Sequence, residues 1–269
     1  MLPAQSRAVL VWSGVLAPLV LTTSIAGLMD ASVYAQETDN WALQARGQDL
    51  GNLLAVVVLV VAALRHRRGS QRAGLVWLGT VLYLIYAFLV YAFALHLTYL
   101  FLGYVAVLAV SAWAMIFTLN SIRHPGIRYP QGRTRSLAAW VLIAIGVMFA
   151  GLWLSELVPA LLTGTVPASV TEAGLWVNPV HIIDLSMVLP GFVITGIAAL
   201  RGRQYGLFWL APWLVFSVLM GSSIVAAMVL LMAAGASDTV PATVMVCLVV
   251  AASLIAARGY LTALADETR

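Results

Sequence analysis

The most constraining feature of this chain is a set of long segments without a charged side chain. Fifty consecutive residues between Arg72 and Arg123 carry no charge, a 22-residue gap ends at Asp30, and a 34-residue gap follows Arg203. About 20 apolar residues cross the hydrocarbon layer as a helix, so the 50-residue run holds two spans joined by a tight turn. Only 9% of the 269 residues are charged, whereas soluble domains carry about 25%. The sequence therefore predicts a polytopic membrane protein.

Helix-breaking residues divide the apolar sequence into eight predicted helices. Gly69-Ser70, Pro125-Gly126 and the segment 164–167 fall between apolar stretches long enough to span a bilayer. We predict an all-α membrane protein with eight transmembrane helices at residues 8–29, 42–64, 74–95, 98–119, 136–157, 179–200, 205–233 and 240–262.

The arginines orient these helices. All 14 cationic side chains are arginines, and with the N-terminus inside every one except Arg46 falls on the cytoplasmic side. Cytoplasmic loops of membrane proteins carry an excess of basic residues. The sequence thus predicts a multi-pass protein of the inner or plasma membrane with both termini in the cytoplasm. Residues 33–36, VYAQ, have some likeness to a signal-peptidase site, so cleavage of the first helix stays open as an alternative.

Missing residue types restrict the chemistry. Schiff-base chemistry on a lysine side chain, including retinal binding, is excluded because the chain has no lysine. Cys247 is the single cysteine, so no intrachain disulfide can form. No Ser-His-Asp order, phosphate-binding loop, CxxC or nucleic-acid motif occurs. We expect the lipid bilayer, a small solute or ion, or a second copy of the chain as partners, and no nucleic acid.

The chain reads as two copies of one four-helix unit. Asp49-Leu50 matches Asp184-Leu185, AALRHR at 62–67 matches AALRGR at 198–203, and LVWL at 75–78 matches LFWL at 207–210. Because four is an even number of spans, both copies enter the membrane from the same side and form a parallel repeat. We predict a first repeat over 1–119, a cytoplasmic Pro/Gly/Arg linker over 120–135 and a second repeat over 136–269.

Two aspartates stand inside predicted helices. Pro179 suits the first helical position after an Asn178 cap, which puts Asp184 more than one turn inside its helix. Asp49 lies about two turns inside the second helix if residue 39 or 40 is the cap. Each has a basic residue three positions earlier, Arg46 or His181, on the same helix face.

These residues suggest an outward-facing polar cluster. An acid within the membrane is costly and by default marks a functional site. The candidate ligand-binding residues are Asp49, Asp184, His181, Arg46, Glu156 and His96.

Other interpretations of the cluster stay open. Acids near helix N-termini are stabilised by the helix dipole, so the pairs could merely fix the packing register. His181, Asp184, Glu156 and His96 are also metal ligands by type, although no spacing is diagnostic. Haem held by two of the four histidines is a weaker alternative, because the remaining pair lies in arginine-rich loops. The sequence identifies no cofactor.

Aromatic residues are concentrated in the third and fourth helices, whereas the matching part of the second repeat, 220–223, reads MGSS. Most such rings serve the membrane interface and helix packing. A cavity between the repeats would nevertheless have rings on one wall only. The aromatic residues are Tyr83, Tyr86, Phe88, Tyr91, Phe93, Tyr99, Phe101 and Tyr104.

Three segments, GQDLGNLL, LHLTYLFLGY and VHIIDLSMVLPG, resemble a group of bacterial multi-pass membrane proteins with no assigned activity. The likeness covers most of residues 45–225. It implies an integral membrane protein of the cell envelope and no particular reaction, cofactor or site residue.

The leading hypothesis is binding or transport of a small solute or ion through the outer Asp/His/Arg cluster. Paired acids within the membrane and parallel repeats favour it. The alternatives are a membrane-embedded metal-dependent enzyme that uses His181, Asp184 and Glu156, and a non-catalytic sensor or assembly subunit in which the cluster only packs.

Overall fold

The computed structural model describes residues 3–122, 127–236 and 239–266. Eight helical segments in these ranges are long and apolar enough to cross a bilayer. The protein is therefore an all-α, multi-pass membrane protein, as predicted. Arg123, His124, Asp238 and Arg269, which entered the charge argument, lie outside the described residues. The spanning helices are α1 (Pro3–Met29), α2 (Asp39–Arg67), α3 (Gln71–Ala94), α4 (Phe101–Ile122), α5 (Gly132–Thr163), α7 with α8 (together Pro179–Leu200), α9 (Gln204–Ala233) and α10 (Val240–Thr262).

The sixth span is broken into three pieces. The Asn178 side chain accepts from the Val180 amide and Pro179 occupies the first turn, so α7 (Pro179–Ile183) begins where the sequence predicted. A π-helical turn, η2 (Asp184–Val188), follows, and the Leu189 amide donates to the Asp184 carbonyl five residues back. The segment then continues as α8 (Leu189–Leu200). Pro190 has no N–H to donate to residue 186 and its ring crowds that carbonyl, so a wider turn fits there.

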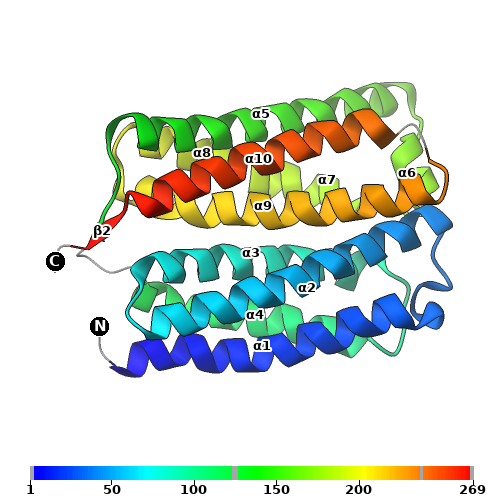
Figure 1. Cartoon of the computed structure of the whole chain (residues 1–269). Helices are drawn as coiled ribbons and strands as arrows, with labels where there is room; N and C mark the ends of the chain where they lie inside the picture. The colour runs from blue at the N-terminus through cyan, green and yellow to red at the C-terminus, as the bar shows by residue number, and fades with distance from the viewer. Residues whose placement is uncertain (1–2, 123–126, 237–238, 267–269) are drawn as a thin grey trace.

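The helices form two four-helix units with the same internal contacts. In the first unit α1 contacts α2 and α4, and α3 contacts α2 and α4; in the second α5 contacts α8 and α10, and α9 contacts α8 and α10. Figure 1 shows the first unit as the lower, blue-to-green layer and the second as the upper one. This correspondence supports the predicted repeat, which stays a prediction.

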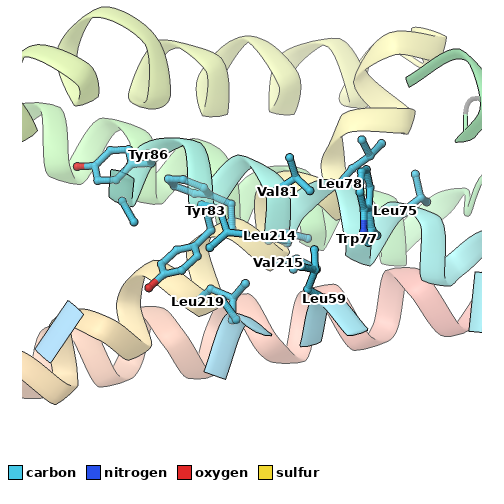
Figure 2. Close-up of a cluster of buried hydrophobic side chains, with 14 of the residues drawn as sticks. Leu59, Leu75, Trp77, Leu78, Val81, Tyr83, Tyr86, Leu214, Val215 and Leu219 are labelled. Carbon is cyan, nitrogen blue, oxygen red and sulfur yellow. The ribbon is translucent and has the colours of Figure 1, made fainter. Parts of the chain in front are cut away.

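The two units are joined mainly through α2, α3 and α9. Gly47 and Gly51 of α2 pack directly against Ala227 and Ser223 of α9, and a β-carbon at either glycine would collide with these residues. Small residues spaced by four let helix backbones approach closely in membranes. Helix α3 is consequently central. Figure 2 shows its side chains packed with Leu59 of α2 and with residues of α9, namely Leu214, Val215 and Leu219.

The segment between α4 and α5 is shorter than the predicted linker. Helix α4 runs to Ile122 and α5 begins at Gly132, so both helices extend into the 120–135 range. Between them β1 (Ile127–Arg128) pairs antiparallel with β2 (Ala265–Asp266), the only strand pair in the described residues. This pair lies at the end of the bundle where α1 begins (Figure 1).

The opposite end, called here the distal end, carries the short elements η1 (Ala31–Tyr34) and α6 (Ala168–Glu172). Hydrogen bonds between separate elements stabilise this end, and two of them involve the start of α2. The Thr38 hydroxyl donates to the Glu172 carbonyl at 2.8 Å and so joins the two units, and Trp41 Nε1 donates to the Ala94 carbonyl at 2.8 Å. Thr38 also caps α2, one residue before the predicted cap.

Candidate functional site

Asp184 is held by two uncharged donors from different helices. Its Oδ1 accepts from the Tyr86 hydroxyl of α3 at 3.0 Å, and its Oδ2 accepts from Trp153 Nε1 of α5 at 2.9 Å. The residue is only 9% exposed. Among the described residues, no Arg or His nitrogen makes an ion pair with this carboxylate. Asp184 is therefore a buried acid with hydrogen-bond partners and no counter-charge.

Asp184 also begins the π-helical turn η2. A π turn inside a membrane helix interrupts the regular hydrogen-bond ladder, and such turns occur frequently at functional sites. The acid and the irregular backbone coincide, which strengthens the case for a site at this position.

A cavity of about 440 Å³ adjoins Asp184. It extends from residues at the distal end, such as Trp41, Asn178 and Thr239, down to Phe192 and Val249. Helices of both units contribute walls: α2, α3, α5, the broken sixth span, α9 and α10. The lining is mainly apolar, with the aromatic and sulfur side chains Trp41, Tyr86, Tyr91, Phe149, Trp153, Phe192, Phe216, Met220, Met228 and Met245.

Among the described residues, Asp184 is the only Asp, Glu, Arg or His in this lining. The remaining polar groups are neutral amides and hydroxyls, including those of Gln44, Gln48, Ser217 and Ser223. The Ser223 hydroxyl is 3.2 Å from Gln48 Oε1, a contact that links α9 to α2. A solute in the cavity would meet one carboxylate, several neutral polar groups and many rings.

Two predicted site residues lie beside the cavity without lining it. His181 Nε2 is 3.8 Å from Glu156 Oε2, and Glu156 also accepts a hydrogen bond from the Ser169 hydroxyl. The Trp153 ring packs against the His181 ring with centroids 4.7 Å apart. Trp153 thus contacts both Asp184 and His181, and His181 in turn lies next to Glu156. The indole N–H of Trp153 donates to the Asp184 carboxylate.

Asp49 has a different environment. Its Oδ2 accepts from Tyr34 at 2.7 Å and its Oδ1 from Tyr91 at 2.9 Å, and the residue is 0% exposed. It does not line the cavity. The sequence predicts Arg46 as its nearest partner on the same helix. No ion pair joins the two side chains and Arg46 Nε is buried without a hydrogen bond, so the groups that hold the carboxylate are the two tyrosine hydroxyls. Spacing of three fixes the helix face, whereas the hydroxyls that reach the carboxylate come from elsewhere.

His96 belongs to the distal surface. Its Nδ1 is 3.1 Å from Glu37 Oε2, and its backbone N–H donates to Glu37 Oε1 at 2.7 Å. This contact ties the loop after α3 to the segment before α2. His96 is outside the cavity and does not join Asp184.

A second distal contact involves Asp30. Its carboxylate accepts from the Ser32 hydroxyl and amide at 2.7 and 2.9 Å, and from the Tyr99 hydroxyl at 2.7 Å. The bonds from Ser32 and then Tyr99 lower the pKa of Asp30, and the bond to Asp30 raises the pKa of Tyr99. Burial and the nearby Asp49 raise the pKa of the Tyr34 hydroxyl above its usual range.

Sequence reasoning missed the residues that hold the two acids. The aromatic run in the third helix correctly indicated rings in the cavity wall, since Tyr86 and Tyr91 line it. The expectation that rings occupy one wall only is wrong, because the second unit contributes rings as well, from Phe149, Trp153, Phe192 and Phe216. Nothing in the sequence indicated Trp153 or Tyr34, because their roles depend on contacts between distant helices.

The described part of the chain contains no group of three or more His, Cys, Asp and Glu side chains arranged to hold a metal ion. Comparisons with models of known protein families, with functionally curated proteins and with solved structures found no match. The fold and the site define a polytopic α-helical membrane protein with a mainly apolar cavity whose described lining includes one carboxylate, that of Asp184.

Proposed function

We propose that this protein binds a small, largely apolar solute in the cavity, with Asp184 as the polar anchor. One observation carries the proposal. A cavity of about 440 Å³ with rings on its walls is lined, as far as the described residues go, by one Asp, Glu, Arg or His, and Tyr86 and Trp153 hold its carboxylate. Ligand sites are typically clefts of about 300–1,000 Å³ with apolar walls and a few placed polar groups. An acid within the membrane that faces a cavity is also a functional signature.

The anchor is pre-organised. Both carboxylate oxygens accept one hydrogen bond each, and the donors belong to different units, Tyr86 to the first and Trp153 to the second. A carboxylate can accept further bonds beyond these two. A solute would therefore find the carboxylate already oriented. Binding would then cost little side-chain conformational entropy, which favours affinity.

We infer that the distal end faces the outside of the cell, so that the solute enters from there. The excess of arginines at the end with the termini supports this orientation. Reporter fusions after Arg128 and after Arg203 should read cytoplasmic, and a fusion near Glu172 should read external. A cytoplasmic signal near Glu172 would contradict the orientation.

Occupation of the cavity can be tested with a pair of substitutions. Met245→Trp places a large ring in the cavity. Met148→Trp is the matched control, because Met148 is 39% exposed and does not line the cavity. A panel of small amphiphiles should raise the melting temperature of the wild type and of Met148→Trp, and Met245→Trp should lose this response. Equal responses in all three proteins would place binding elsewhere and overturn the proposal.

A further inference from the structure

The charge balance of the cavity identifies the class of solute. Within the part of the chain that the structure describes, Asp184 is the only Asp, Glu, Arg or His that lines the cavity, and the Tyr86 and Trp153 groups that contact it are neutral. Neutral donors hold a carboxylate in place but leave its charge uncompensated, and a buried charge is stable only when it is paired or protonated.

The described residues supply no ion-pair partner for this charge. The nearest basic residue along the helix, His181, lies next to Glu156 instead and is absent from the lining. Arg46, the outer arginine, makes no ion pair with either aspartate and does not line the cavity. No basic side chain of the described residues therefore balances the Asp184 carboxylate in the cavity.

The rings next to Asp184 suit a cation. Tyr86, which donates to Asp184, packs edge-to-face against Phe216 with centroids 5.6 Å apart, and Phe216 packs against Phe192 at 6.0 Å. Trp153 adds an indole at the other carboxylate oxygen. Ring faces carry partial negative charge and attract ammonium groups, a combination used to recognise quaternary amines.

A bare inorganic cation fits less well. Hard cations require about six to eight oxygen ligands, whereas the cavity offers one carboxylate in a lining of mainly carbon and sulfur. An anionic solute is disfavoured because no Arg or His of the described ranges lines the cavity. The remaining class has both an apolar body and a positive charge.

We propose that the solute is an organic cation, an amine or quaternary ammonium attached to an apolar body, whose charge pairs with Asp184. This inference rests on the proposed function and adds the sign of the solute's charge to it. The apolar body would contact the rings and methionines of the walls, and the cationic group would supply the missing counter-charge.

Three small probes of similar shape separate charge from shape. Benzyltrimethylammonium is the cation, neopentylbenzene is its neutral carbon isostere and benzenesulfonate is an anion. Binding to the full chain in lipid nanodiscs is measured by calorimetry or by thermal shift. The cation should bind the wild type at least about tenfold more tightly than the neutral isostere, since charge pairing and ring contacts add to the apolar term.

Substitution of the anchor sharpens the test. Asp184→Asn keeps the size of the side chain and should remove the preference for the cation while leaving the binding of neopentylbenzene unchanged. Asp30→Asn, the same chemical change on the distal surface, should alter neither the preference for the cation nor the binding of neopentylbenzene. If Asp184→Asn does not fold, the comparison of probes on the wild type still tests the sign of the charge.

The outcomes distinguish this inference from the proposed function. Equal or tighter binding of the neutral isostere, abolished by Met245→Trp, would overturn the cationic solute and leave a solute-binding cavity. Preferential binding of benzenesulfonate would do the same. Absence of binding by all three probes would count against both proposals.

Discussion

The two units of this protein carry the same kind of acid in opposite surroundings. Asp49 in the first unit and Asp184 in the second each accept one hydrogen bond on each oxygen, and in both cases one donor is a tyrosine of α3. Asp49 is sealed, whereas Asp184 borders a cavity of about 440 Å³. Two buried acids with similar hydrogen bonds can thus differ in whether a cavity adjoins them.

The difference comes from the side chains that surround each acid. In the first unit the Tyr91 ring packs against Tyr104 with centroids 5.1 Å apart and against Phe88 at 5.4 Å, which fills the space beside Asp49. In the alignment that the predicted repeat implies, Phe88 and Tyr91 correspond to Met220 and Ser223, and both of these line the cavity. Smaller and more flexible side chains leave a hollow where the first unit has rings.

The largest expected effect is at Gly27. A β-carbon there would collide with Asp49 Oδ2 and the Tyr34 hydroxyl, whereas a β-carbon at Gly151 of α5 would meet nothing within 4 Å. Gly27→Val should lower the free energy of unfolding by about 3 kcal/mol or more, because overpacking here also breaks buried hydrogen bonds. Gly151→Val should be nearly neutral. Denaturant titration in detergent micelles measures both, and similar losses would show that the sealed site is not tightly packed.

The next effect separates the two acids. In Asp49→Asn an amide N–H₂ faces a tyrosine donor in a sealed space, so stability should fall by about 1–3 kcal/mol, the cost of a buried unsatisfied group. Asp184→Asn can relax toward the cavity and should lose less stability while losing its preference for a cation. Melting curves and probe binding on both variants make the comparison. A larger loss of stability in Asp184→Asn would reverse the assigned roles.

The two tyrosines of α3 provide a smaller contrast. Tyr91→Phe removes a donor from Asp49 and should cost about 1 kcal/mol of stability. Tyr86→Phe removes the donor from Asp184 and should mainly weaken binding of the cationic probe, since the freed oxygen no longer has a fixed orientation. Thermal shift with and without the probe separates the effects. Equal loss of binding in both variants would argue that Tyr91 also contributes to the site.

The smallest effect concerns the distal surface and pH. Hydrogen bonds from Ser32 and Tyr99 lower the pKa of Asp30 below its usual 3.8, so the folded state favours the ionised form. The resulting stabilisation is present above the unfolded-state pKa and is lost as the pH falls through the lower, folded-state pKa. Melting temperature measured downward from pH 5 should decline slightly more steeply in the wild type than in Asp30→Asn. Identical slopes would show that these exposed contacts contribute nothing to stability.

The sequence alone determined the class of protein, the number of spanning helices in the described residues and, to within about three residues, most of their ends. These properties depend on hydropathy, breakers and caps along the chain, and the Asn178-Pro179 start of the sixth span is an example. Asp49 and Asp184 were found the same way, because a charge inside an apolar segment is visible without a fold. The ring-lined wall was also partly predicted, through Tyr86 and Tyr91.

Only the tertiary structure decided what each acid contacts. The expected pairing of Asp49 with Arg46 followed from spacing on one helix, but hydroxyls of Tyr34 and Tyr91 reach the carboxylate from other elements. The cavity likewise has no sequence signature, since it is the volume left when six helical segments of both units pack together, with rings contributed by each unit. Hydrophobicity is a property of each segment, whereas a site is made by distances between segments, and packing sets those distances.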